Sequence, residues 1–216
     1  AREIAFIVRD DAGDRIVKSN DSLQELETLT TAGDITGFKI TDNWLAVVSA
    51  SEAGDSELIL TDRSTGKEKI LKAGGDVRVS ALDISESLGK LVYTAQVVEI
   101  VSGIAIAKGA HTIYVYDLAS GSTSIYEPNL EVADYMDIRF TDDDYGLVIR
   151  AGDGTYYLYD FEHPDTSVSL GRHISMSNFS MDGDKVIFLD QPIRAVYSAF
   201  PTISIVDDRR EQVSIG

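Results

Sequence analysis

A unit of four short apolar segments recurs along this chain of 216 residues. The first segment ends in Ile or Phe followed by Ser or Thr, at positions 40–41, 84–85, 140–141 and 179–180. An acidic turn follows, and then a strongly apolar second segment such as WLAVVSA (44–50) or KVIFLD (185–190). The third segment ends at Asp62, Asp117, Asp160 and Asp207, which lie 55, 43 and 47 residues apart, and a short fourth segment closes the unit.

The segments have the pattern of β-strands. In TIYVYD (112–117), Ile113 and Val115 fall on one face and Tyr114 and Tyr116 on the other, as alternation in a strand requires. A period of about 40–50 residues with four strands is typical of a β-propeller blade. The sequence therefore predicts an all-β propeller of four-stranded antiparallel blades, four complete and a fifth with three strands, with under one residue in ten in helix.

The repeat divides the chain into blades at 1–32 (partial), 33–73, 74–129, 130–171 and 172–216, within a single propeller domain or segment spanning 1–216. The first unit lacks its innermost strand, and the last ends on an outermost one. Three arrangements remain open: the missing strand comes from outside this chain, the ring is larger, or an edge stays open. The chain does not begin with Met, which is typical of a processed product or a fragment.

The second strands should be buried between neighbouring blades. This set comprises Trp44, Val47, Leu91, Val92, Leu147, Ile149, Val186 and Phe188. The aspartates that end the third strands should cap turns: in DRSTG (62–66) and DLASG (117–121) the carboxylate accepts backbone N–H groups and the glycine takes a positive φ.

Two blades carry a family resemblance. FSMDGDKVIFLD (179–190) and HTIYVYDLASGSTSIYEP (111–128) resemble the two halves of the WD40-like (PD40) repeat of TolB-type propellers. Met181 stands where that repeat has Pro, and the WLAVV blade lacks its Asp-Gly turn. The resemblance implies the propeller fold and favours an extracytoplasmic location, periplasmic or at the cell surface. It implies no single activity, and no G-x-S-x-G peptidase motif occurs.

The composition of the chain limits the classes of molecule that it can bind. A formal net charge of −17 argues against nucleic acid, whose phosphates need a basic surface, and disfavours contact with an anionic membrane. The chain has no cysteine, and its three histidines form no metal-binding motif, so we expect no transition metal and no cofactor. The acidic turns at 10–14 and 142–144 offer oxygen ligands for Ca²⁺, but neither matches an EF-hand loop, and solvated turns are the expectation.

Two apolar insertions between the second and third strands, 96–110 and 191–201, are the main functional signal. Antiparallel blades place both on one face, where they would cover each other or the propeller's central channel, or contact another chain. Contact with a membrane surface is a third alternative, which the negative charge disfavours. The candidate partner-binding residues are Val97, Val98, Ile100, Val101, Ile104, Ile106, Ile193, Val196, Tyr197 and Phe200. These predict a non-catalytic scaffold that binds another protein chain or domain, self-association included, as a module of a surface or envelope assembly. The alternative is a glycosidase-like propeller enzyme using carboxylates from separate blades; the sequence assigns no catalytic residue.

Overall fold

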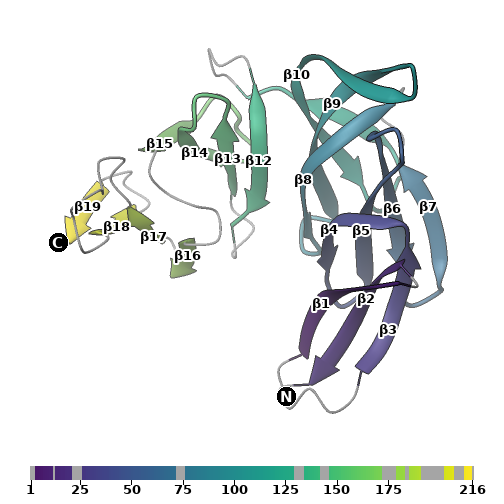
Figure 1. Cartoon of the computed structure of the whole chain (residues 1–216). Helices are drawn as coiled ribbons and strands as arrows, with labels where there is room; N and C mark the ends of the chain where they lie inside the picture. The colour runs from purple at the N-terminus through teal and green to yellow at the C-terminus, as the bar shows by residue number, and fades with distance from the viewer. Residues whose placement is uncertain are drawn as a thin grey trace. The chain divides into compact units, whose positions relative to one another are not determined.

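The fold consists of five separate β-sheets, each formed by strands that follow one another in the chain (Figure 1). The structure, a computed structural model, describes residues 3–11, 13–20, 26–71, 76–128, 134–141 and 146–171, and the backbone of the strands at 179–182, 185–190, 202–206 and 212–215. No helix occurs among these residues, so neither does a helix long and apolar enough to cross a membrane.

The sheets have three or four strands. The three-stranded sheet contains β1 (Glu3–Asp10), β2 (Gly13–Asn20) and β3 (Leu26–Ala32). The second contains β4 (Asp34–Ile40), β5 (Trp44–Ala50), β6 (Ser56–Asp62) and β7 (Lys67–Leu71). The third contains β8 (Val77–Ser85), β9 (Lys90–Val101), β10 (Ile104–Asp117) and β11 (Thr123–Tyr126). The fourth contains β12 (Tyr135–Phe140), β13 (Gly146–Ala151), β14 (Tyr156–Asp160) and β15 (Ser167–Gly171). The fifth contains β16 (Phe179–Asp182), β17 (Lys185–Asp190), β18 (Thr202–Val206) and β19 (Gln212–Ile215).

Consecutive strands pair in the antiparallel sense expected of a blade. In the second sheet, for example, β5 and β6 pair without interruption from Trp44 opposite Asp62 to Ala50 opposite Ser56. Four complete sheets and one three-stranded sheet match the predicted number and kind of blades. The predicted fold class is therefore confirmed.

The recurring Ser or Thr after the first strand closes the turn that follows it. The Thr41 hydroxyl accepts the backbone N–H of Trp44 at 3.1 Å, and the Thr141 hydroxyl accepts that of Gly146 at 2.8 Å. In the third sheet the Ser85 hydroxyl accepts the N–H of Leu88 at 3.1 Å. This landmark of the repeat therefore has a structural role, since each hydroxyl satisfies a backbone donor where the strand pairing ends.

The second recurring residue, the Asp at the end of the third strand, caps the next turn as the sequence predicts. Asp62 Oδ1 accepts the N–H of Ser64 at 2.9 Å, and Asp117 Oδ1 accepts that of Ser120 at 2.6 Å. Gly66 and Gly121, which close these turns, have φ values of 69° and 71°. Neither aspartate needs a further function to explain its place in the repeat.

The Asp62 turn gives a first testable expectation. The Ser64 hydroxyl, 2.6 Å from Asp62 Oδ1, and the hydrogen bonds from Thr65 lower the pKa of Asp62 from 3.8 to about 2. Because the folded-state pKa lies below the unfolded one, the turn's contribution to stability is present above pH 3.8 and is lost as the pH falls through 2. We expect ¹³C NMR of the carboxyl carbon to show a midpoint near 2, rising in Ser64→Ala; a native midpoint near 3.8 would contradict the turn geometry.

The chain divides into two compact units, one formed by residues 1–79 with 95–109 and the other by 80–94 with 110–216. In the first unit a core cluster contains Ile16, Ile35, Leu45 and Val47. In the second unit the core cluster contains Val92, Ile113, Val115, Ile138, Phe140, Leu147, Ile149 and Tyr159. Second strands of their blades supply much of both clusters.

Most second-strand residues predicted to be buried are buried: Val47, Leu91, Val92, Leu147 and Ile149. Trp44 is an exception, because it begins β5 beside the 41–44 turn and is only half-buried. Val186 and Phe188 lie outside the residues whose side chains the structure describes.

Carboxylates also join successive sheets within each unit. In the first unit Asp14 Oδ2 on β2 accepts the N–H of Ile35 on β4 at 2.9 Å, while the Arg9 guanidinium donates to the Ile35 carbonyl at 2.9 Å. In the second unit the buried Asp83 on β8 accepts the N–H of Phe140 on β12 at 2.8 Å. These bonds join β4 and β12, the edge strands of their sheets, to a strand of the preceding sheet.

Candidate functional site

The first insertion is an extension of two strands. β9 and β10 have 12 and 14 residues, whereas the strands at the same place in the second sheet, β5 and β6, have 7 each. Ser102 and Gly103, with φ values of 54° and 80°, form the two-residue turn between them. We call residues 95–109 the hairpin extension. It is redundant for closing the blade, since shorter strands close the other sheets.

One side of the hairpin extension is fixed to its own unit. The Ala105 N–H donates to the Ala53 carbonyl at 2.7 Å, and the Val98 N–H donates to the Asp76 carbonyl at 2.9 Å. The Arg78 guanidinium bridges two segments, donating to the carbonyls of Gly54 at 3.1 Å and Ala105 at 3.2 Å. The extension is therefore held against the 51–55 loop of the preceding sheet.

The other side of the hairpin extension is exposed in the part of the chain that the structure describes. Residues two apart in a strand share a face, so Val97, Glu99 and Val101 lie together, opposite Val98. On β10, Ile104 and Ile106 likewise share a face with Lys108. A 2.6 Å ion pair between Lys108 and Glu99 places these two sets on the same side. We call this side, formed by Val97, Val101, Ile104 and Ile106 with the ion pair across it, the free hairpin face.

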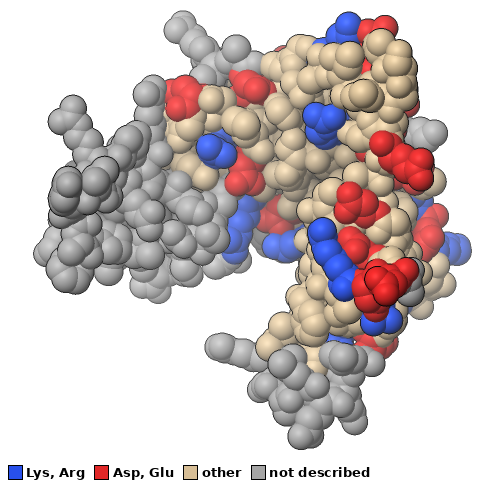
Figure 2. Space-filling model, in the orientation of Figure 1, with Lys and Arg blue, Asp and Glu red and all other residues tan. Residues whose placement is uncertain are grey.

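The exposure of the side chains differs between the two sides of the hairpin extension. Ile104 is 64% exposed, and Val97, Val101 and Ile106 are each more than two-fifths exposed. Ala105 and Val98, on the fixed side, are nearly buried. Figure 2 shows a largely uncharged surface where Figure 1 draws the β9–β10 hairpin, with charges toward its upper rim.

The predicted partner-binding residues therefore separate into three groups. The free hairpin face contains Val97, Val101, Ile104 and Ile106. On the opposite side of β9, Val98 is 5% exposed and so is not available for contact, whereas Ile100 is 39% exposed. The residues of the second insertion, Ile193, Val196, Tyr197 and Phe200, lie outside the described residues, and so does the predicted placement of both insertions on one face.

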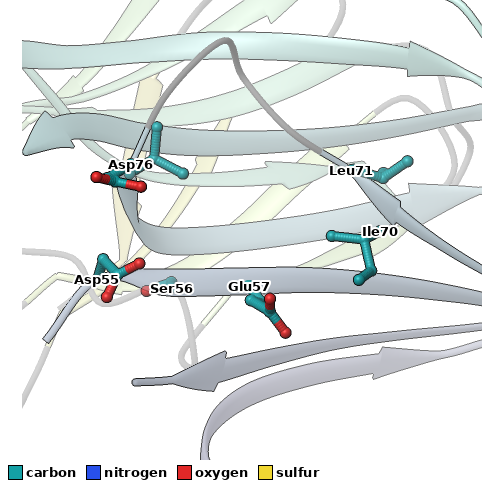
Figure 3. A pocket seen from close by; sticks show the side chains of 7 residues that line it. Asp55, Ser56, Glu57, Ile70, Leu71 and Asp76 are labelled. Carbon is teal, nitrogen blue, oxygen red and sulfur yellow. The ribbon is translucent and has the colours of Figure 1, made fainter. Parts of the chain in front are cut away.

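An acidic pocket (Figure 3) includes Asp76, whose carbonyl accepts the Val98 N–H of the hairpin extension. It has a volume of about 200 Å³ and is lined by Asp55, Ser56, Glu57, Ile70, Leu71, Asp76 and Val77. Asp55 already accepts a hydrogen bond from the Ser51 hydroxyl, and Figure 3 shows the Glu57 carboxylate pointing away from Asp76. Glycoside cleavage needs two carboxyl groups that flank one bond, and Glu57 does not face the other two carboxylates of this pocket.

Two carboxylates of the acidic turn at 10–14, which offers oxygen ligands for Ca²⁺, have other partners. Asp10 accepts a 2.7 Å bond from the Arg15 guanidinium, and Asp14 lies 3.6 Å from Arg9 Nε besides accepting the Ile35 N–H. Residues 142–144 lie outside the described part of the chain. Within the described residues, no group of three or more His, Cys, Asp or Glu side chains is placed to hold a metal ion.

Two of the three histidines have carboxylate partners that the sequence did not reveal. His163 lies 3.0 Å from Asp160 within a turn. His111 Nδ1 lies 2.7 Å from Asp134 Oδ1, and its Nε2 lies 2.8 Å from the Ser80 hydroxyl. These last three residues are 31 and 23 positions apart in sequence, so no local motif brings them together. The third histidine, His173, is not among the described residues.

Comparison with known proteins identifies the chain through its fold. No protein-family model matches it, and no curated protein sequence matches it. Among solved structures, TolB from Acinetobacter baumannii superposes with a TM-score of 0.66 and 16% identity, over 98% of this chain and 51% of TolB. This chain thus spans about half the length of that TolB structure.

Two further structures have the same fold. The β-propeller domain of the Trilobed protease from Pyrococcus furiosus has a TM-score of 0.58 and 15% identity, over 85% of this chain and 57% of that one. A chain of a nidogen/laminin complex has a TM-score of 0.59 and 10% identity, over 93% and 70%. The class of protein is therefore a β-propeller. Within that class the chain has a TolB-like fold, as the repeat motifs indicate.

Proposed function

We propose that this chain is a protein-binding propeller module, a single domain over 1–216 within a larger surface or envelope assembly, and that it binds its partner through the free hairpin face. One observation carries the proposal: an extension that the blade does not need is anchored on one side and presents Val97, Val101, Ile104 and Ile106 to solvent on the other. Fully burying an aliphatic side chain contributes about 1.5–3 kcal/mol, so covering this face would stabilise a complex appreciably.

The partner we propose is a different protein, with an apolar contact surface and a basic rim. Two copies of this chain would each bring a net charge of −17 and would repel one another. Glu99 and Lys108 on the free hairpin face neutralise each other, so this face is complementary to an apolar surface on the partner. Positive charges around that surface would complement the chain as a whole. The similar nidogen/laminin structure is itself a protein complex, which is in keeping with this use of the fold.

Replacing both Ile104 and Ile106 by Ser tests the proposal. Both side chains are exposed in the isolated chain, so the variant should unfold at the same denaturant concentration as the wild type. A photo-crosslinker placed at Val101 would identify the partner in the source cells. With that partner purified, calorimetry should show at least about tenfold weaker binding to the double variant, since 1.4 kcal/mol corresponds to tenfold.

A matched control removes two aliphatic side chains of similar exposure elsewhere. Ile4 on β1 and Ile125 on β11 are 45% and 57% exposed, and the Ile4→Ser, Ile125→Ser variant should bind as the wild type does. Equal binding by the Ile104→Ser, Ile106→Ser variant and the wild type would overturn the site. Association of the chain only with itself, detected by sedimentation velocity, would overturn the choice of partner.

A further inference from the structure

Three side chains of the second unit form a chain of hydrogen bonds from a hydroxyl to a carboxylate. Ser80 is an exposed residue of β8, His111 belongs to β10, and Asp134 immediately precedes β12. The Ser80 hydroxyl lies 2.8 Å from His111 Nε2, and His111 Nδ1 lies 2.7 Å from Asp134 Oδ1. The imidazole is largely enclosed, with its side chain 11% exposed. Hydroxyl, imidazole and carboxylate thus stand in the order that activates a serine nucleophile.

The surroundings of Asp134 fix the direction of these hydrogen bonds. Its Oδ1 accepts the backbone N–H of His111 at 2.6 Å and that of Tyr135 at 3.0 Å, in addition to the imidazole. Burial raises the pKa of Asp134, but the hydrogen bonds from the His111 backbone and ring outweigh it and hold the pKa below its usual value. An ionised carboxylate only accepts, so Nδ1 carries a proton. In the neutral imidazole the Nε2 lone pair then faces Ser80, and the Ser80 hydroxyl is the donor.

The backbone around Asp134 is shaped to keep its carboxylate in place. The Gly152 N–H donates to the Asp134 carbonyl at 2.8 Å. A Cβ atom at Gly152 would lie 2.7 Å from the Asp134 Cβ, which is closer than such atoms approach. Glycine at position 152 therefore permits the close approach that places Asp134 beside His111.

We propose that Ser80 is a nucleophile toward activated carboxylic esters, with His111 as its general base and Asp134 as the residue that positions His111. In the acylation step Ser80 Oγ attacks the ester carbonyl and transfers its proton to Nε2. The C–O bond to the leaving group then breaks, and the leaving alcohol takes that proton. In the second step water attacks the acyl-serine, His111 receives the water proton and returns it to Ser80 Oγ, and the carboxylic acid departs. Since a nucleophile and a base are what these residues supply, the substrates expected are esters with good leaving groups.

The first test is covalent labelling of Ser80. A fluorophosphonate probe forms an O–P bond to the attacking serine and releases fluoride, while the base takes up the serine proton. We expect peptide mapping by mass spectrometry to find the label on Ser80, a p-nitrophenyl acetate assay to show release of p-nitrophenolate, and Ser80→Ala to lose both. Ser80→Ala removes one exposed hydroxyl and should leave the fold intact. His111→Gln should slow labelling by about 10²-fold or more.

Ser120 provides the matched control for the nucleophile. It is exposed, and its hydroxyl lies 2.8 Å from that of Ser122. Ser120→Ala should leave labelling and ester cleavage unchanged. Labelling of Ser80 at the same rate as Ser120 in the wild type would overturn the proposal. The hairpin variant Ile104→Ser, Ile106→Ser should be labelled normally, so this inference and the proposed binding function fail separately.

A second test uses the absence of cysteine from the chain. Ser80→Cys and Ser120→Cys each carry a single thiol, and an imidazole base should make the first one reactive. At pH 6.5 we expect iodoacetamide to alkylate Ser80→Cys at least about tenfold faster than Ser120→Cys, with the difference abolished by His111→Gln. Equal alkylation rates would contradict the role of His111, even if the native serine proved slow.

The tautomer of the His111 imidazole tests the role of Asp134. ¹⁵N NMR distinguishes the two neutral tautomers of histidine, and the wild type should show His111 with its proton on Nδ1. In Asp134→Asn the amide can present a donor to Nδ1, so the proton should move to Nε2 and labelling of Ser80 should fall with it. An unchanged tautomer together with unchanged labelling would remove Asp134 from the mechanism.

Discussion

Replacing Leu147 by Ala is expected to lower the free energy of unfolding by about 2–5 kcal/mol. Leu147 lies on β13 with none of its surface exposed, within the core cluster that includes Ile138, Phe140 and Tyr159. Truncation removes apolar contacts and leaves a cavity that packed strands cannot close. Chemical denaturation of the two proteins measures the difference directly.

The control for Leu147 is a truncation at the surface. Ile125→Ala on β11 removes a similar volume from a side chain that is 57% exposed, and it should change stability by no more than about 0.5 kcal/mol. An unfolding midpoint unaffected by Leu147→Ala would mean that β13 presents its other face to the core, and that the register with β14 is wrong.

The second large effect is expected at Asp83, a carboxylate that is only 3% exposed. Asp83 Oδ2 accepts the N–H of Phe140 and Oδ1 accepts that of Ile84 at 3.0 Å. Asp83→Ala leaves both donors without this acceptor, and each buried unsatisfied group costs about 1–3 kcal/mol. We therefore expect a loss of about 2–6 kcal/mol in the free energy of unfolding.

Asp83→Asn separates the hydrogen bonds from the bulk of the side chain. The amide keeps one acceptor oxygen, so it can satisfy Phe140 or Ile84 but not both, and its cost should lie between those of the wild type and Asp83→Ala. Hydrogen exchange at the Phe140 amide shows which donor is lost. If Asp83→Ala changed the free energy of unfolding by less than about 0.5 kcal/mol, the hydrogen bond from the Phe140 N–H to Asp83 would not contribute to stability.

The fold was predictable from the sequence because its signals are local. The hydroxyl after the first strand and the Asp after the third each satisfy backbone donors two to five residues away, and they recur at fixed places in the sequence of the four complete blades. Strand alternation likewise depends only on neighbours in sequence. Trp44 shows the limit of this reasoning, because its exposure depends on where the strand ends and on the turn beside it.

The candidate sites were predictable only in part. The length and apolar character of the hairpin extension are visible in the sequence, but the side that is fixed depends on Arg78 and the 51–55 loop of another sheet. For this reason the sequence predicts contact by Val98, whose side chain is only 5% exposed. The Ser80, His111 and Asp134 group is assembled from three strands or strand ends. No spacing in the sequence predicts it.

The carboxylate bonds between sheets have a consequence for how such a chain can diversify. At both junctions a side chain on one sheet binds the backbone N–H of a residue on another: Asp14 binds Ile35, and Asp83 binds Phe140. A backbone N–H is the same in every residue except proline, so each bond requires one aspartate and no particular side chain on the receiving residue. The side chains of Ile35 and Phe140 remain constrained only by the core clusters in which they pack. Any apolar residue that fits the core at the receiving position would therefore keep the bond, with no compensating substitution at the aspartate.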